Sequence, residues 1–271
     1  MNTHIALTKN VSIPALGFGT WQLTGAECVE GVAKAIEVGY RHIDTADAYG
    51  NHEQVAEGIK NSGIARKDLF LTTKVWNDKH LRGDVIASAE RFLKELETDY
   101  IDLLLIHWPI RAVPVEETLK AMEELKQKGI VRAIGVSNFT EHHIDDALAS
   151  GVEVVNNQVE IRPQWSQKKL REYCASKNIS ITAYSSLRGG DPDVRLIVAL
   201  AEAYEKTPAQ IILNWVLSRG MIAIPKSSNA GRIKENFESG GFEMSEEDLM
   251  KIDGLPQTGR ANLPSFADFD Y

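Results

Sequence analysis

An aspartate and a tyrosine stand five residues apart in this chain, at Asp44 and Tyr49, and Asp44 directly follows a short apolar run typical of a strand. A free phenol has a pKa of about 10, so a tyrosine becomes a useful acid near neutral pH only where a cation stabilises its phenolate. The next two strand-like runs end in Lys74 and His107. Three consecutive strands thus end in Asp, Lys and His, and we expect Lys74 to lower the pKa of Tyr49.

Each of these residues also has an ordinary structural explanation. A single Asp, Lys or His at a strand end is more often a satisfied polar group than a catalytic one. An ion pair between Asp44 and Lys74 is compatible with catalysis as long as the phenol of Tyr49 can still lie next to Lys74. A strand lysine in a barrel can also form a Schiff base, so an aldolase-like lyase that uses Lys74 is an alternative.

The strands that carry these residues belong to a series of apolar runs that alternate with helical patterns. Such alternation indicates parallel strands with crossover helices. Eight runs in 271 residues predict one domain, residues 1–271, with the α/β fold of a (β/α)8 or TIM barrel. The runs are Leu16–Thr20, the segment around Ile43, Leu69–Thr73, Ile101–Ile106, Ala133–Val136, Val154–Val159, Ile179–Ala183 and Met221–Ile224.

Further elements are expected outside the barrel repeat. Apolar residues on both sides of Lys9-Asn10 predict an N-terminal β-hairpin that plugs the bottom of the barrel. Capping residues at Thr207 and Ser245 predict helix starts, and Asp191–Lys206 predicts an additional helix near the C-terminal end. The tail Gln257–Tyr271 has several aromatic residues but no helical period, which indicates an ordered loop over the barrel mouth.

Composition restricts the partners and the location. A net charge of −8 and a pI near 5.5 argue against a nucleic-acid surface, which is normally basic. The start resembles no leader peptide and no apolar run reaches the ~18 residues of a membrane span, so we expect a cytoplasmic protein, monomeric and without membrane contact.

Cys28 and Cys174 are expected to be packing residues on helices. His142 and His143 are adjacent and would diverge on a helix, so we expect them to be solvated and predict no metal site.

At this point the residues resemble a known family, the aldo-keto reductases. Within it, the short loop Pro109–Pro114 and the segment Trp76–His80 are most like the bacterial 2,5-diketo-D-gluconate reductase group. The resemblance extends nearly from end to end, because its motifs occur in the family's order at Gly17–Trp21, Asp44–Tyr49, Thr72–Trp76, Ile106–Pro109, Gly135–Phe139 and Ile224–Ser227.

The resemblance implies that Tyr49 is the general acid in carbonyl reduction, that Lys74 lowers its pKa, that Asp44 holds Lys74, and that His107 orients the substrate carbonyl. Small aldehydes, α-dicarbonyls such as methylglyoxal and keto-sugar acids such as 2,5-diketo-D-gluconate are the expected substrates. No metal is needed. The expected substrate contacts are Trp21, Tyr49, Trp76, His107 and Trp108, which give mostly aromatic walls.

The cofactor implied by the resemblance is NADPH, although no Rossmann fingerprint is present, since Gln22 stands where the third glycine would be. The expected contacts of the nicotinamide amide are Ser137, Asn138 and Gln158, with Tyr184 stacked on the ring. The expected contacts of the adenosine 2′-phosphate and adenine are Lys226, Ser227, Ser228, Arg232, Glu235 and Asn236, and further cofactor contacts are Gly19, Thr20, Trp21, Ser185 and Leu187. Asn138 and Gln158 could instead serve only to form turns. Lys226 and Arg232 could instead be ordinary positive residues at the start of a helix, without a phosphate to bind.

Some residues depart from the family pattern. Ser186 stands where the family commonly has proline, and the loop that contains it is short, which suggests a less enclosing clasp on the cofactor and faster release. Arg162 occupies a position where histidine or another polar residue is usual, and its role is open. Arg188 is interpreted as a solvated loop residue, with attraction of a substrate carboxylate as the alternative. A non-catalytic NADPH-binding regulatory subunit remains the rival to an enzyme.

Overall fold

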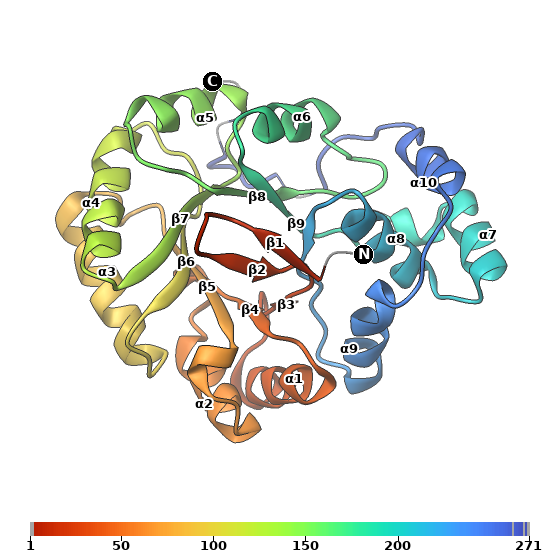
Figure 1. Ribbon diagram of the computed structural model, residues 1–271, viewed down its shortest axis with the longest axis horizontal. Coiled ribbons are helices and arrows are strands. Elements are labelled where there is room, and N and C mark those ends of the chain that lie inside the picture. The colour runs from red at the N-terminus through yellow and green to blue at the C-terminus, as the bar shows by residue number, and fades with distance from the viewer. Residues whose placement is uncertain (1–2, 262, 268, 270–271) are drawn as a thin grey trace.

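Eight parallel strands form one curled sheet, which the helices surround in this computed structural model of residues 3–261, 263–267 and 269 (Figure 1). Neighbouring strands pair in chain order, and a parallel bridge between Leu16 and Ala223 closes the sheet into the predicted barrel. The strands are β3 (Phe18–Gly19), β4 (His42–Asp44), β5 (Phe70–Val75), β6 (Ile101–Ile106), β7 (Val131–Ser137), β8 (Asn156–Glu160), β9 (Ser180–Tyr184) and β10 (Ile222–Ala223).

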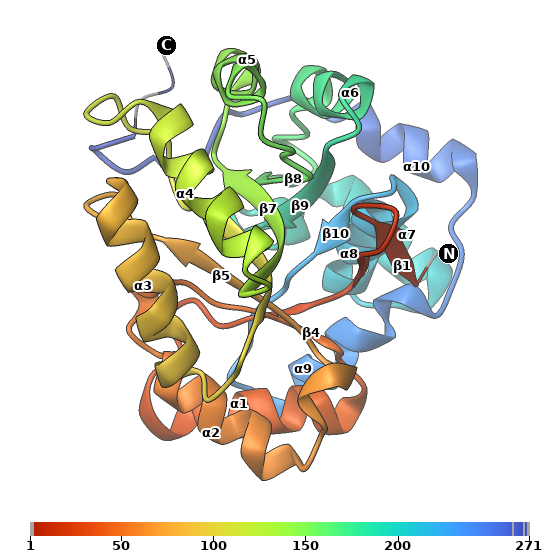
Figure 2. The same ribbon diagram turned by 60° about the vertical axis from the view of Figure 1, so that its left-hand side comes forward.

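Helices cover the outside of the barrel, as Figure 2 shows for α1 to α4. The crossover helices are α1 (Gly25–Val38), α2 (His52–Ser62), α3 (Arg82–Glu95), α4 (Val115–Gln127), α5 (Glu141–Ala149), α6 (Lys168–Ser176) and α8 (Pro208–Ser218), and α9 (Ala230–Phe237) follows the last strand. The predicted extra helices near the C-terminal end are α7 (Arg195–Tyr204) and α10 (Glu246–Asp253), and short 3₁₀ turns lie at η1 (Asp47–Tyr49), η2 (Arg66–Asp68), η3 (Asp191–Asp193) and η4 (Glu238–Gly240).

Local sequence explains where several helices begin. The Thr207 hydroxyl accepts a hydrogen bond from the Gln210 amide and Gln210 bonds back to Thr207, which makes a capping box at the start of α8. Ser245 caps α10 in the same sense by accepting from the Asp248 amide. The helix expected over Asp191–Lys206 is shorter, because η3 comes first and α7 begins at Arg195.

The predicted N-terminal hairpin consists of β1 (His4–Ala6) and β2 (Ser12–Pro14), which pair antiparallel. It lies across the centre of the barrel in the view of Figure 1. Leu7 and Ile13 are buried in one apolar cluster with inward-facing residues of the strands, among them Phe70, Leu103 and Ile222. The hairpin therefore closes the end of the barrel from which the parallel strands start, as expected.

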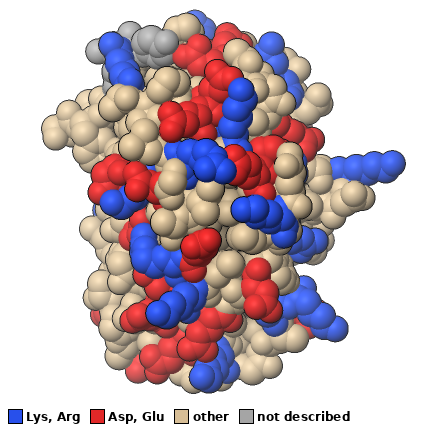
Figure 3. All heavy atoms as spheres, turned by 90° about the vertical axis from the view of Figure 1, so that its left-hand side faces the viewer, with Lys and Arg blue, Asp and Glu red and all other residues tan. Residues whose placement is uncertain are grey.

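Acidic and basic side chains alternate over the face drawn in Figure 3, and no large patch of one sign stands out on it. Among the described residues, no helix is both long and apolar enough to cross a membrane. Cys28 in α1 and Cys174 in α6 are both buried and free, which confirms their role as packing residues.

Candidate active site

Asp44 and Lys74 form a buried ion pair where β4 ends and near the end of β5. The Lys74 Nζ atom lies 2.6 Å from Asp44 Oδ1 and donates a second hydrogen bond to the Thr45 carbonyl at 2.8 Å. Gln158 donates from its Nε2 atom to the other oxygen, Asp44 Oδ2, at 2.7 Å. Lys74 is 0% exposed and has no face on the cavity described below, so a Schiff base at this lysine has no support.

Tyr49 and His107 stand beside this pair. The 3₁₀ turn η1 carries Tyr49, and its ring centroid lies 5.2 Å from Lys74 Nζ, so the pair does not exclude the phenol. The rings of Tyr49 and His107 meet edge to face with centroids 5.8 Å apart, and the Trp76 ring also packs on His107, with centroids 5.0 Å apart. The structure thus brings the four predicted catalytic residues together.

The charge environment of Tyr49 differs from the sequence-based expectation. Burial raises the pKa of Tyr49 well above its ordinary value, and the nearby Asp44 carboxylate and Tyr184 raise it further. The net shift is thus upward, because burial and the Asp44 carboxylate dominate, and stabilisation of the phenolate by Lys74 stays a prediction. A phenol with a raised pKa is fully protonated at neutral pH, as a proton donor must be.

Burial has the opposite effect on His107, which is 8% exposed. Its pKa is held well below the ordinary value of 6.5, first by burial and then by the charge of Lys74. The imidazole is therefore neutral near pH 7 and able to share a hydrogen bond with a carbonyl oxygen without carrying a charge.

The residues expected around a nicotinamide amide form a polar cluster at the ends of β7, β8 and β9. Asn138 lies in the left-handed region of the backbone at φ 65° and donates from its side chain to the His107 carbonyl and to Ser137 Oγ, both at 3.0 Å. The Tyr184 hydroxyl donates to Asn138 Oδ1 at 2.7 Å, and Ser137 Oγ donates to the Gln158 carbonyl at 2.8 Å. The amide of Asn138 is thus tied to both His107 and Tyr184.

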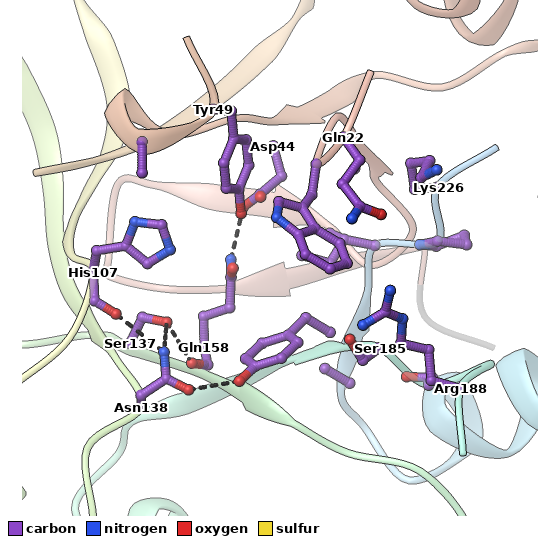
Figure 4. A pocket seen from close by; sticks show the side chains of 18 of the residues that line it. Gln22, Asp44, Tyr49, His107, Ser137, Asn138, Gln158, Ser185, Arg188 and Lys226 are labelled. Atoms are coloured by element: carbon purple, nitrogen blue, oxygen red, sulfur yellow. Dashed lines mark hydrogen bonds between the residues drawn. The ribbon is translucent and has the colours of Figure 1, made fainter. Parts of the chain in front are cut away.

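These groups face a cavity of about 560 Å³ at the carboxyl ends of the strands (Figure 4). Its predicted wall residues are Gly19, Trp21, Asp44, Tyr49, Trp76, His107, Trp108, Ser137, Asn138, Gln158, Tyr184, Ser185, Leu187 and Lys226. Thr20 is buried behind this wall and donates to the Asp44 carbonyl at 3.0 Å.

The far end of the cavity carries positive charge. Lys226 lies on the wall, and the Arg188 guanidinium opposite it is 4.4 Å from the centre of the Trp21 ring. Ser186 lies on the loop that follows β9, and its buried hydroxyl has no hydrogen-bond partner in the described part of the chain. An aromatic and amide-rich end joined to a cationic end suits a nicotinamide dinucleotide, whose phosphates need cations and hydroxyl donors.

The remaining predicted phosphate and adenine residues lie beyond this wall. Ser227 is buried, Ser228 and Arg232 are exposed, and Asn229 caps α9 by accepting from the Arg232 amide at 3.0 Å. Glu235 accepts from the Thr207 hydroxyl at 2.8 Å and so has a structural contact as well, and Asn236 is 4% exposed.

Sequence reasoning missed part of the cavity wall. The missed residues are Gln22, Ala48, Ala183, Ser186, Leu213, Ile224, Pro225, Pro264 and Phe266. Phe266 of the C-terminal tail packs edge to face on Trp76 and Trp108, with centroids 5.6 and 5.4 Å apart, so the tail covers the mouth as expected. Tyr271, the last residue of that predicted loop, lies outside the described residues. Arg188 is exposed, as expected from the sequence, and it also lines the cavity.

The histidine pair on α5 also needs a correction. His142 is exposed as expected, but His143 is buried, because its ring nitrogen accepts from the Thr140 amide and completes a capping box. Within the described ranges, no cluster of three or more His, Cys, Asp or Glu side chains could hold a metal ion.

Comparison with known proteins agrees with this geometry. The sequence matches the profile of the Aldo/keto reductase family over residues 15–191 and 192–256. It is 42% identical to glyoxal reductase of Bacillus subtilis strain 168 (94% of each chain) and 41% identical to methylglyoxal reductase DkgA of Escherichia coli strain K12 (95% of each chain). The crystal structure of a putative 2,5-diketo-D-gluconic acid reductase B superimposes with a TM-score of 0.95 at 36% identity, covering 99% of this chain and 97% of that one. The barrel, its cavity and these similarities together place the chain in the aldo/keto reductase family.

Proposed function

We propose that the protein reduces small carbonyl compounds to alcohols with NADPH and uses Tyr49 as the general acid. The observation that carries the proposal is the contact group of Asp44, Lys74, Tyr49 and His107 beside a cavity with an amide end and a cationic end. Membership of a family of carbonyl reductases supports the same chemistry.

Ser137, Asn138, Gln158 and Tyr184 would hold the nicotinamide end of NADPH, which supplies the hydride when bound. The chain's own residues act on the carbonyl oxygen. His107 hydrogen-bonds to that oxygen, and Tyr49 donates its proton as negative charge develops there. Lys74 then stabilises the phenolate that remains, with Asp44 holding the ammonium group in place.

The adenosine end supports NADPH rather than NADH. Lys226, Ser227, Ser228 and Arg232 offer cations and hydroxyl groups close to the start of α9, which suit a dianionic 2′-phosphate. Glu235 and Asn236 are proposed to contact the adenine.

Small aldehydes and α-dicarbonyls such as methylglyoxal are the proposed substrates, with keto-sugar acids such as 2,5-diketo-D-gluconate in the same class. Trp21, Trp76 and Trp108 give the cavity apolar walls that suit small and varied carbonyl compounds. Two relatives named for glyoxal and methylglyoxal reduction support the dicarbonyls. The cytoplasmic location and the monomeric state stay predictions from the sequence.

The test is NADPH consumption by the purified protein with glyoxal, methylglyoxal, simple aldehydes and 2,5-diketo-D-gluconate, with NADH in parallel. Tyr49→Phe keeps the ring beside His107 and removes only the acidic hydroxyl. We expect it to lower kcat by a factor of about 10² to 10⁴ while the affinity for NADPH is retained. Near-normal turnover by the folded variant would remove the acid assignment, and NADPH binding without consumption on any carbonyl would favour the non-catalytic alternative.

A further inference from the structure

Arg162 is a buried arginine just beyond the end of β8, and it bonds to three separate segments of the chain. Its side chain is 3% exposed, and its Nε and Nη1 atoms lie 3.1 Å from Glu160 Oε1 and 2.7 Å from Asp191 Oδ2. Both carboxylate side chains are 0% exposed. The same guanidinium donates to the carbonyl of Gly259 in the C-terminal tail. A planar fork with five donors can serve all of these acceptors at once, whereas a lysine or a histidine cannot.

The tail is fastened to the barrel around this arginine. The amide of Ala261 donates to Glu160 Oε1 at 2.8 Å, and the amide of Thr258 donates to the Gln164 carbonyl at 2.8 Å. Only a few residues further on, Pro264 and Phe266 line the cavity. Because this part of the tail has no helix or strand, its place over the cavity depends on the hydrogen bonds of residues 257–261 and on the packing of Phe266.

The loop that follows β9 meets the same guanidinium from the other side. Gly189 lies so close that a Cβ atom added there would be 2.9 Å from Arg162 Cζ, and Asp191 begins η3 directly after this loop. Ser185 to Arg188 of the loop line the cavity at its cationic end (Figure 4). The tail and the loop are thus two covers of one cavity, and both touch Arg162.

We propose that Arg162 is a positioning residue that ties these two covers together, so that a ligand that orders the loop also orders the tail over the carbonyl site. The inference rests on the proposed function only for the identity of that ligand, NADPH. The physical reason is that both covers bond to one buried ion-pair group. Moving the loop would take Asp191 away from a buried cation, and moving the tail would leave buried polar groups of Arg162 and Glu160 without the Gly259 carbonyl and the Ala261 amide.

The first test is amide hydrogen exchange of residues 185–193 and 257–267 in the protein without cofactor. Arg162→Lys keeps the charge but loses the fork, and we expect exchange in both segments to rise by about tenfold or more. The matched control is Arg66→Lys, because Arg66 also holds a buried carboxylate, Asp102, at 2.7 Å but does so at the closed end of the barrel. A rise of the same size in both variants, or none in Arg162→Lys, overturns the proposal.

Gly189→Ala gives a second variant in case Arg162→Lys does not fold, because it leaves every charged group in place. The residue has a φ of 75°, and the added methyl group crowds the Arg162 guanidinium. We expect faster exchange in the tail as well as in the mutated loop. A change confined to residues 185–193 contradicts the tie between the covers.

The coupling itself is tested by adding NADPH. In the wild type we expect slower exchange in both segments, whereas in Arg162→Lys the loop is protected and the tail is not. Arg162→Lys should also raise the KM for the carbonyl substrate more than it lowers kcat, since Tyr49 and His107 are not touched. Protection of the loop alone in the wild type overturns the coupling. The exchange results without cofactor do not depend on NADPH turnover, so failure of the proposed function is recognised separately.

Discussion

At the residue scale, the charge environment of Tyr49 leads to a definite pH profile. The pKa of the phenol is raised well above its ordinary value, so Tyr49 keeps its proton through the neutral range. With Tyr49 as the proposed general acid, the reduction rate should fall only as the pH rises through that pKa. The pKa of His107 lies well below 6.5, so its charge does not change in the neutral range. We therefore expect kcat/KM for carbonyl reduction to be level from about pH 6 to about pH 10, with a fall only above the ordinary phenol range.

Initial rates in buffers of constant ionic strength measure this profile. A rise or fall in rate centred near pH 6.5 that disappears in His107→Gln would contradict the neutral imidazole.

The choice between NADPH and NADH is also a residue-scale question. Arg232→Leu removes an exposed guanidinium next to the Asn229 cap of α9, and we expect it to weaken NADPH binding by about tenfold to a hundredfold with little effect on NADH. Lys234→Leu is the control on the same helix, since Lys234 is 69% exposed and pairs with Glu238 at 3.8 Å. Dissociation constants from fluorescence titration decide the matter, and an equal loss for the two cofactors would refute the assignment of Arg232.

At the scale of elements, the barrel requires close approach of strands at Gly135 on β7. A Cβ atom there would lie 2.6 Å from the Leu105 side chain and 2.7 Å from the Asn156 carbonyl. We expect Gly135→Ala to lower the free energy of unfolding by about 1–3 kcal/mol. Gly83 in α3 has nothing within 4 Å of such an atom, so Gly83→Ala should raise the free energy of unfolding by about 0.5–1 kcal/mol.

Urea unfolding of both variants measures the difference. The idea of strand crowding fails if Gly135→Ala is as stable as the wild type.

A helix cap gives an independent prediction at this scale. The Thr207 hydroxyl accepts from the Gln210 amide and donates to Glu235 of α9, so it supports two helices. Thr207→Ala should lower the free energy of unfolding by about 1 kcal/mol, and Thr207→Ser should recover most of it. Thermal or urea unfolding checks the pair, and equal stability of the Ala and Ser variants would argue against the cap.

These elements differ in how far the sequence could predict them. The start of α8 is encoded within four residues, Thr207 to Gln210, and the strands are encoded by short apolar runs, so both were predictable. The grouping of Asp44, Lys74, Tyr49 and His107 was predictable because parallel strands end at one edge of the sheet. The contacts of Arg162 were not predictable, since its partner carbonyl on Gly259 lies 97 positions away and no periodic pattern connects them. The raised pKa of Tyr49 likewise depends on burial and on Asp44, which only the assembled site reveals.

At the scale of the whole molecule, buried histidines predict sensitivity to acid. Burial lowers the pKa of His42 and of His80 from 6.5 to about 4. In the unfolded chain both take up a proton below pH 6.5, whereas the folded state resists it, so stability is present above pH 6.5 and is lost as the pH falls toward 4. Each tenfold difference in proton affinity between the folded and unfolded chain corresponds to about 1.4 kcal/mol, so the loss amounts to a few kcal/mol.

Urea midpoints between about pH 7.5 and about pH 4.5 measure this loss. A midpoint that stays constant across that range would contradict it.

The hairpin of β1 and β2 has a kinetic consequence for the whole molecule. It closes the end of the barrel from which the strands start, so the cavity opens only toward the opposite end among the described residues, where Phe266 partly covers it. The proposed dinucleotide, reaching from Lys226 to Ser137, would lie deeper in the cavity than the carbonyl compound and would be blocked by a carbonyl compound bound first. We therefore expect ordered binding, in which the proposed cofactor binds first and dissociates last. The alcohol should leave by the same opening through which the carbonyl compound entered.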